Sequence, residues 1–245
     1  MLRKKLIKFV RSIVRWMGYD IVQFTIGTHP IPRQEALMKE YQIDTVIDVG
    51  ANIGLYGRKL IKSLNYKGDI YSFEPMAKEF KGLKNESKNF EKWTVFNEAL
   101  GDKQQKLKIN VSENSVSSSI LGILDKHTES APESKYSHQE EVSVNTLDNI
   151  VKENNLKDKN IFLKLDVQGF ERQALLGGGD SLKYIDTIQV EISLVPLYEG
   201  GIVFEELFDM LRVQGYTLVA IENGFSHKTT GQMLQMDGIF HRYSS

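Results

Sequence analysis

The chain has 245 residues, a length that fits one large α/β domain or two small ones. Hydrophobic residues make up 41% of it and charged residues 26%, which is the composition of a globular protein, and the lack of cysteine excludes disulfides, thiolate metal sites and a cysteine nucleophile. Since 31 Lys and Arg face 32 Asp and Glu, the formal net charge of −1 argues against a general nucleic-acid binder.

The first 19 residues are predicted to form a basic amphipathic helix. They contain six basic residues and no acidic one, so the rest of the chain carries a net charge of −7. One face is apolar and another is basic. The apolar face consists of Leu2, Leu6, Phe9, Val10, Ile13, Val14 and Met17, and the basic face of Lys4, Lys8, Arg11 and Arg15. Such a helix binds an anionic membrane or an acidic partner, or it docks on its own domain, and the sequence leaves these alternatives open.

Residues 45–100 are predicted to alternate between buried strands and helices, which is the signature of βαβ units in a parallel sheet. The expected strands are residues 45–50, 69–75 and 93–100. One expected helix carries apolar residues from Leu55 to Leu64, and the other is rich in lysine and ends at about Asn89. This part of the chain therefore predicts three strands joined by two helical crossovers.

Residues 101–141 are predicted to be an insertion, with an extended piece at 107–111 followed by a polar segment that lacks periodicity. Regular patterns return after it. We expect a short strand and a helix within 141–151, strands at 160–167, 187–192, 217–222 and 235–242, and helices at 171–176 and 204–213. These elements predict one doubly wound α/β domain over residues 41–245, preceded by a helix and its lead-in over residues 1–40.

The sequence DVGANIG, residues 48–54, is predicted to bind a nucleoside cofactor. A buried strand ends near Asp48, and Gly50 and Gly54 allow a tight turn and a close approach of ligand to backbone before the next helix. Asn52 stands where a dinucleotide fingerprint requires its second glycine, which disfavours NAD and FAD. Glu74 ends the next strand, where an acid accepts both hydroxyls of a ribose.

Six sequence blocks, in order, resemble the FkbM-type methyltransferases. The blocks are DVGANIG at 48–54, FEP at 73–75, NEALGD at 97–102, VNTLD at 144–148, KLDVQGFE at 164–171 and the Glu191 of QVEI. The resemblance covers roughly residues 40–242 and implies an S-adenosylmethionine-dependent enzyme. It also implies the Rossmann-like class I fold, an α/β fold with a seven-stranded, mostly parallel sheet whose last strand is antiparallel. The commoner family form has Glu where this chain has Gln168, so we assign no catalytic carboxylate there.

The same resemblance assigns cofactor contacts residue by residue. It places the methionine end of the cofactor at Asp48, Gly50, Ala51, Asn52 and Gly54. It gives the ribose hydroxyls to Glu74 and sets Met76 against the adenine. It lines the adenine site with Asn97, Glu98 and Ala99, where Glu98 reaches the amino group of the base.

Asp166 and Glu191 are the candidates for the chemistry at the acceptor. Methyl transfer mainly requires alignment, but an alcohol also needs a general base or a metal to activate it. Asp166 ends the fourth strand and Glu191 the fifth, so either is placed to take the hydroxyl proton or to bind a hard cation such as Mg²⁺. Lys164 lies on the same side of its strand as Asp166, so an ion pair is the alternative role for this acid. None of the five histidines is assigned.

Together these features predict an S-adenosylmethionine-dependent O-methyltransferase that acts on a hydroxyl of a sugar, a glycan or a secondary metabolite. One alternative is a nicotinamide-dependent oxidoreductase, and another is a catalytically silent interaction domain of the same fold. The expected partners are a small-molecule or glycan acceptor and, through residues 1–19, a membrane surface, but no nucleic acid; the oligomeric state is open. The expected location is the cytoplasm, including the inner membrane surface if the helix binds there.

Overall fold

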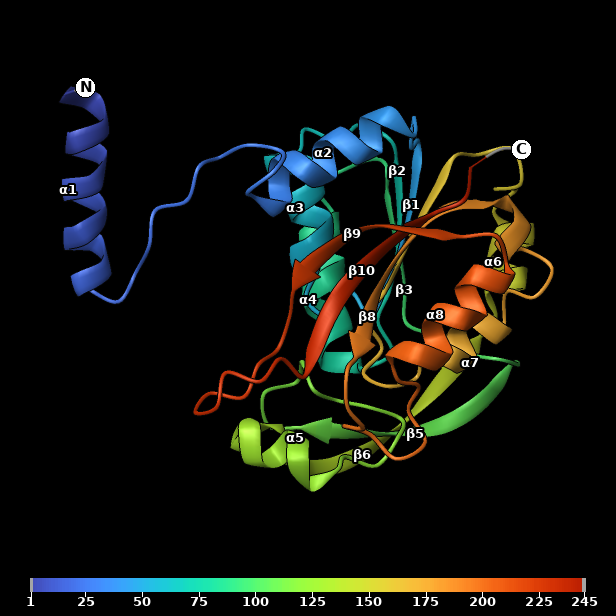
Figure 1. Ribbon diagram of the computed structural model, residues 1–245. Coiled ribbons are helices and arrows are strands. Elements are labelled where there is room, and N and C mark those ends of the chain that lie inside the picture. Colours follow the sequence, from blue (N-terminus) through green and yellow to red (C-terminus); the bar gives the residue numbers. More distant parts are fainter. Residues whose placement is uncertain (1, 244–245) are drawn as a thin grey trace. The chain divides into compact units, whose positions relative to one another are not determined.

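The computed structural model describes residues 2–243, with side chains from Lys5 onward (Figure 1). Three residues of the predicted segments 1–40 and 41–245 lie outside the described residues, namely Met1, Ser244 and Ser245. The side chains of Leu2, Arg3 and Lys4 also lie outside them. Contacts divide the chain into two compact units, one that ends at Glu40 and one that begins at Tyr41.

The first unit contains helices α1 (Leu2–Trp16) and α2 (Pro30–Glu40). The helix expected over residues 1–19 ends at Trp16, because Gly18 adopts a left-handed φ of 84° and its N–H bonds the carbonyl oxygen of Arg15. The sequence analysis did not foresee α2. Among residues 2–243, no helix is both long and apolar enough to cross a membrane.

The second unit is built on a seven-stranded sheet with the order β3-β2-β1-β7-β8-β10-β9. The strands are β1 (Thr45–Val49), β2 (Asp69–Phe73), β3 (Trp93–Phe96), β7 (Ile161–Leu165), β8 (Ile185–Ser193), β9 (Thr217–Asn223) and β10 (Gln235–His241). Only β10 runs against the others, since it is antiparallel to both β8 and β9. The predicted α/β fold, with a mostly parallel seven-stranded sheet and an antiparallel last strand, is confirmed.

Helices cover both faces of this sheet (Figure 1). Helices α3 (Leu55–Ser63) and α4 (Ala77–Ser87) lie on one face, and α6 (Leu147–Glu153), α7 (Glu171–Leu176) and α8 (Phe204–Val213) lie on the other. The central strands β1 and β7 are buried along their whole length. Continuous apolar strands such as these are typical of a parallel sheet that is covered on both sides.

A second, smaller sheet occupies most of the predicted insertion, and it contains the extended piece expected at 107–111 and the short strand expected from 141. It consists of β4 (Ala99–Leu100), β6 (Tyr136–Asn145) and β5 (Gln105–Ser112), in that spatial order, with α5 (Asp125–Ser130) between β5 and β6 in the chain. The region is therefore more regular than its composition predicts. The reason is that the first half of β6 is largely exposed and polar, so it shows no apolar alternation.

The strand predicted over residues 93–100 is split between the two sheets. β3 ends at Phe96, and Ala99 and Leu100 pair instead with Val144 and Asn145 of the small sheet. The Asn97 side chain stabilises the chain between β3 and β4, because its amide nitrogen donates to the carbonyl oxygens of Glu74 and Pro75, both at 2.9 Å. The small sheet thereby lies beyond the carboxyl ends of the parallel strands (Figure 1).

Close packing of α3 against the sheet is set by Gly57. A Cβ at this position would stand 2.2 Å from the ring of Trp93. The indole nitrogen of Trp93 donates to the Ser72 hydroxyl at 2.9 Å, and that hydroxyl donates to a carboxylate oxygen of Asp48 at 3.3 Å. The packing of one helix is thus linked to a buried acid at the end of β1.

The substitution Gly57→Ala should therefore lower stability even though alanine favours helix. Overpacking of this kind costs about 1–3 kcal/mol in the free energy of unfolding, which urea denaturation would measure. The control Ser63→Ala changes an exposed residue of the same helix and should have little effect. An unchanged unfolding midpoint for Gly57→Ala would show that Trp93 moves aside freely.

Candidate active site

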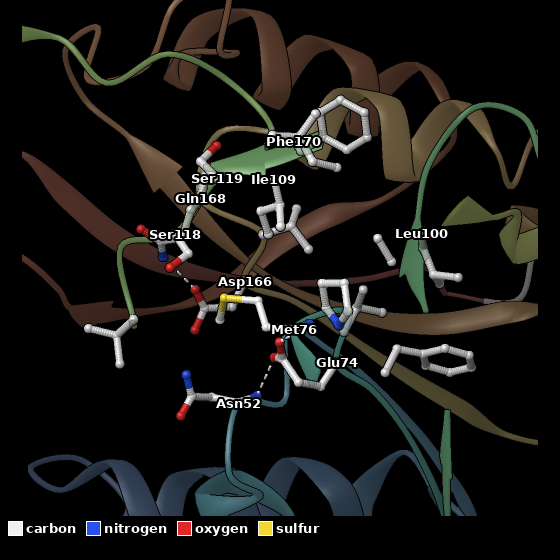
Figure 2. Close-up of a pocket in the computed structure, with 18 of the residues that line it drawn as sticks. Asn52, Glu74, Met76, Leu100, Ile109, Ser118, Ser119, Asp166, Gln168 and Phe170 are labelled. Carbon is white, nitrogen blue, oxygen red and sulfur yellow. Dashed lines mark hydrogen bonds between the residues drawn. The ribbon is translucent and has the colours of Figure 1, made fainter. Parts of the chain in front are cut away.

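A cavity of about 660 Å³ opens at the carboxyl ends of β1, β2 and β7 (Figure 2). Its floor is made by the strand ends, and its roof by residues of the small sheet and of the loop that follows β5. Its lining comprises Val49, Gly50, Asn52, Phe73–Met76, Ala99, Leu100, Ile109, Ser115, Val116, Ser118–Ile120, Asp166–Gln168 and Phe170. The small sheet therefore completes the cavity that the large sheet begins.

The turn after β1 requires glycine at position 50. Gly50 has a φ of 80°, and a Cβ there would lie 1.9 Å from the carbonyl oxygen of Asp166. Its N–H and that of Ala51 both donate to the carbonyl oxygen of Phe73, at 3.0 Å. The ends of β1, β2 and β7 are consequently drawn together, and bare backbone faces the cavity.

Glu74 lies near the middle of the cavity (Figure 2). One of its carboxylate oxygens accepts the N–H of Asn52 at 2.8 Å and the other accepts the N–H of Met76 at 2.9 Å. Burial raises the pKa of Glu74 to about 7, although these two N–H donors oppose the shift. Each oxygen has a further lone pair, so the carboxylate can accept two hydroxyl groups of a ligand.

The two ends of the cavity differ in polarity (Figure 2). Leu100, Ile109 and Phe170 give one end apolar walls, whereas Asn52 and Ser118 lie with Asp166 at the other. Since Glu74 stands between the ends, the cavity fits an elongated ligand that has an apolar end, a middle with hydroxyl groups and a polar end.

A second cavity, of about 700 Å³, adjoins the first. It is lined by Asn114, Val116, Ser117, His127, Ala131, Glu133, Asp166, Gln168, Glu191, Phe225 and Gln235. Val116, Asp166 and Gln168 line both cavities. Asp166 therefore stands in the wall through which a group bound in one cavity would reach a group bound in the other.

Lys164 is buried between two carboxylates. Its ammonium nitrogen lies 3.4 Å from Asp48 Oδ1 and 3.3 Å from Asp166 Oδ2. Burial alone would lower the pKa of Lys164, but the charges of Asp166 and Asp48 outweigh it and raise the pKa, so the ammonium stays protonated. The expected Asp166–Lys164 ion pair is present, and it includes Asp48 as a third member.

Gln168 joins the two predicted catalytic acids. Its amide nitrogen donates to Asp166 Oδ1 at 2.7 Å and to Glu191 Oε2 at 2.9 Å. Its amide oxygen accepts the Tyr198 hydroxyl at 2.6 Å, which fixes the orientation of the amide. Burial, followed by the charges of Asp166 and other nearby acids, raises the pKa of Glu191 well above its ordinary value. The Gln168 amide thus holds Glu191 as a hydrogen-bonding group in the wall of the second cavity.

The backbone around Gln168 is held by a separate set of bonds. Gln168 and Gly169 have φ values of 53° and 97°, in the left-handed region. The buried carboxylate of Glu171 accepts the N–H of Val167 at 3.3 Å and that of Gly169 at 3.2 Å, and the Ser119 hydroxyl donates to the Gln168 carbonyl oxygen at 2.6 Å. The loop after β5 is thus tied to the turn that presents the Gln168 amide.

The predicted Mg²⁺ has no support in this arrangement. Within the described part of the chain, no three His, Asp or Glu side chains gather to hold a metal ion. Between Asp166 and Glu191 stands the NH₂ group of Gln168, whose two hydrogens face the oxygens that a cation would need. The residues present do not fit the ion.

The structure brings seven of the twelve predicted site residues to the cavities. Gly50, Asn52, Glu74, Met76, Ala99 and Asp166 line the first cavity, and Asp166 and Glu191 line the second. Asp48, Ala51, Gly54, Asn97 and Glu98 line neither of them. Asp48 faces Lys164 and Ser72 inside the sheet, and Glu98 accepts a bond from the Asn145 amide at 3.0 Å. These two acids therefore bond neighbouring side chains and lie outside both cavities.

Sequence reasoning missed several residues of the site. Gln168 was noticed only as a departure from the family pattern, which gave no indication of its bonds to Asp166 and Glu191. His127 is buried, its Nδ1 has no hydrogen-bond partner among the described residues, and it lines the second cavity. No local pattern distinguishes His127 from a surface histidine.

The strand order and the antiparallel β10 are those of the Rossmann-like class I methyltransferase fold. The family model described as the methyltransferase FkbM domain matches residues 48–218, and the chain belongs to this family. The family supports a methyltransferase that uses S-adenosylmethionine, as the resemblance implied. No curated protein matches the chain.

Solved structures of other methyltransferases are similar at low identity. An rRNA methylase from Streptococcus thermophilus is 9% identical, with a TM-score of 0.47, over 91% of this chain and 100% of that one. A putative tRNA (m1A22) methyltransferase from Streptococcus pneumoniae, in complex with S-adenosyl-L-methionine, is 9% identical, with a TM-score of 0.46, over 87% and 73%. The plantazolicin methyltransferase BamL is 9% identical, with a TM-score of 0.48, over 86% and 84%.

The pKa of Glu74 makes a prediction about stability. Its ordinary value is 4.5 and its folded value is about 7, so between these pH values the unfolded chain has released a proton that the folded protein retains. The folded state without ligand should therefore lose stability as the pH rises from 4.5 to about 7, by an amount on the order of 3 kcal/mol from this group.

The variant Glu74→Gln tests this by removing the titration. Its free energy of unfolding, measured by urea denaturation at a series of pH values, should fall less steeply over that range than that of the wild type. Other buried acids whose pKa is raised by burial, among them Glu171 at about 7 and Glu191, contribute to the slope that remains. Equal slopes for wild type and variant would show that Glu74 titrates normally in the folded protein.

Proposed function

We propose that the protein is an S-adenosylmethionine-dependent O-methyltransferase that methylates a hydroxyl group of a sugar, a glycan or a similar polyhydroxylated metabolite. The family supports the methyltransferase class. The observation that carries the rest of the proposal is the position of Asp166, a carboxylate in the wall shared by two cavities. One cavity suits the methyl donor and the other suits a hydroxylated acceptor.

The first cavity matches the three parts of the donor. The backbone at Gly50 and Asn52 accommodates the methionine end, and Glu74 accepts the ribose hydroxyls. Leu100, Ile109 and Phe170 enclose the adenine. Asp48 acts differently from the sequence expectation in this proposal, since its charge is directed at Lys164 rather than at the amino group of the donor.

The second cavity matches an uncharged acceptor with several hydroxyl groups. Carboxyl and amide groups, which bind hydroxyls, are provided by Asp166, Glu191, Glu133, Asn114 and Gln235. The ring of Phe225 offers an apolar surface to a sugar face. No lysine or arginine is among the described residues that line the cavity, so an acceptor with a phosphate or carboxylate group would meet repulsion without compensation.

Asp166 is the general base in this proposal. S-adenosylmethionine supplies an electrophilic methyl group bonded to a sulfonium. Asp166 Oδ2 faces Lys164 and Oδ1 faces the Gln168 amide, so the carboxylate is held in one orientation at the junction of the cavities. There it would accept the proton of the acceptor hydroxyl as that oxygen takes the methyl group and the carbon–sulfur bond breaks, which leaves S-adenosylhomocysteine. Glu191 instead orients the acceptor through hydrogen bonds, because burial raises its pKa and disfavours the charged form that a general base needs.

Donor binding is testable without knowledge of the acceptor. Isothermal titration should show binding of S-adenosylmethionine to the wild type and none of NADH, the ligand that the oxidoreductase alternative requires. Glu74→Gln should weaken binding by about tenfold or more, because charge-assisted bonds to the ribose are lost. Glu205→Gln is the control, since Glu205 is an exposed residue of α8 that lines neither cavity. Failure of the wild type to bind S-adenosylmethionine would contradict the proposal.

The role of Asp166 is testable with a labelled methyl donor and a panel of neutral and phosphorylated sugars and glycans. The wild type should methylate a neutral member of the panel. Asp166→Asn should lower kcat by about a hundredfold or more, as loss of a general base does, while its Kd for S-adenosylmethionine stays close to that of the wild type. A near wild-type kcat for Asp166→Asn would exclude the base role, and an absence of transfer to any member would favour the silent-domain alternative.

A further inference from the structure

Exposed apolar side chains are concentrated in one short segment of the first unit. Twelve of the nineteen large apolar side chains that are exposed in the described chain lie between Leu6 and Ile26. They are Leu6, Ile7, Phe9, Val10, Ile13, Trp16, Met17, Tyr19, Ile21, Val22, Phe24 and Ile26. Exposed apolar patches of this kind mark surfaces that bind a partner or a membrane.

Helix α1 separates its apolar and basic residues. Leu6, Phe9, Val10, Ile13 and Met17 recur at intervals of three and four residues and share one face. On the opposite face Lys8, Arg11 and Arg15 follow the same spacing. An apolar stripe with a cationic strip behind it is the pattern of a helix that lies in the plane of a bilayer interface.

The charge of this segment is positive and largely uncompensated. Residues 1–20 carry six basic side chains and one acid, Asp20. Asp20 pairs with Arg11 at 2.6 Å and with Arg15 at 3.0 Å, and no described side chain pairs with Lys5 or Lys8. A second copy of the helix would bring like charges together, whereas a surface of anionic lipid complements them.

Length and aromatic residues fit a helix that lies on the bilayer. A helix of 15 residues is about 22 Å long, too short for the ~30 Å hydrocarbon core of a bilayer. Trp16 is 88% exposed at the end of the helix, and Tyr19 and Phe24 follow it. Tryptophan and tyrosine favour the level of the lipid headgroups.

We propose that residues 5–26 form a membrane-docking segment that binds the surface of an anionic bilayer, with the apolar face of α1 buried among the upper acyl chains and its basic face toward the headgroups. The proposal is independent of the methyltransferase chemistry. It gives the enzyme a location beside membrane-borne acceptors or partners without a spanning helix.

The experiment is co-sedimentation of the full chain with vesicles of phosphatidylcholine alone and of equal parts phosphatidylglycerol and phosphatidylcholine. The wild type should bind the anionic vesicles at least about tenfold more tightly, and Lys8→Gln should lower that affinity about fivefold, which corresponds to about 1 kcal/mol per basic residue. The double variant Phe9→Glu/Ile13→Glu should no longer sediment. The control Val213→Glu alters a residue of α8 that is 78% exposed and should bind like the wild type.

Intrinsic fluorescence adds a second readout. The chain has two tryptophans, and Trp93 is buried, so a blue shift on addition of anionic vesicles reports on Trp16. Trp16→Phe should abolish the shift. The proposal is overturned if the wild type does not sediment with anionic vesicles or binds both vesicle types equally. It is also overturned if sedimentation velocity shows a dimer that buries the segment and this dimer does not bind lipid. Unchanged S-adenosylmethionine binding by all variants would confirm that their fold is intact.

Discussion

The buried ammonium of Lys164 is the interaction on which the site depends. Asp48 on β1 and Asp166 at the end of β7 flank it, and Asp48 and Lys164 are neighbours in the register of the two strands. A buried ion is tolerable only when oppositely charged groups compensate it, and removal of Lys164 would leave the buried Asp48 carboxylate unpaired at a cost of about 3–5 kcal/mol. The contacts of Lys164 therefore fix both the pairing of β1 with β7 and the orientation of the Asp166 side chain.

The approach of Gly50 to the Asp166 carbonyl completes this arrangement. Any side chain at position 50 would push β1 away from β7. With the two strand ends in contact, the first cavity reaches the side chain of Asp166, and the second cavity reaches the same side chain from the other direction. Methyl transfer depends mainly on the alignment of donor and acceptor, and in the proposed function this junction supplies that alignment.

Much of the fold was predictable because the central elements have strong local patterns. Helices α7 and α8 match the predicted ranges, and β1 and β7 read as continuous apolar runs since both of their faces are covered. The small sheet was predictable only in part. An extended piece at 107–111 and a short strand from 141 were expected, but the first half of β6 is polar and exposed, and the pairing of β6 with β4 and β5 depends on tertiary contacts. The break at Asn97 likewise depends on carbonyl groups from a different strand.

Site residues that directly follow a strand could be predicted from the sequence. Residues whose position depends on contacts with other strands could be predicted less well. Glu74, Gly50 and Asp166 lie on the cavity, as their positions after strands suggested. Alternation along one strand gave the Lys164–Asp166 pair, but the third member, Asp48, follows only from the register between strands. The bridge made by Gln168 needs Asp166, Glu191 and Tyr198 from three parts of the chain, which no local pattern shows.

The central claim is that donor and acceptor sites meet at Asp166. The most direct measurement is a crystal structure of the protein with S-adenosylhomocysteine, the product left after methyl transfer. We expect the adenine to lie beside Leu100 and Phe170, the ribose hydroxyls to bond Glu74, and the sulfur to face Asp166 and the second cavity. A ligand bound elsewhere, or with its sulfur directed away from Asp166, would contradict the account.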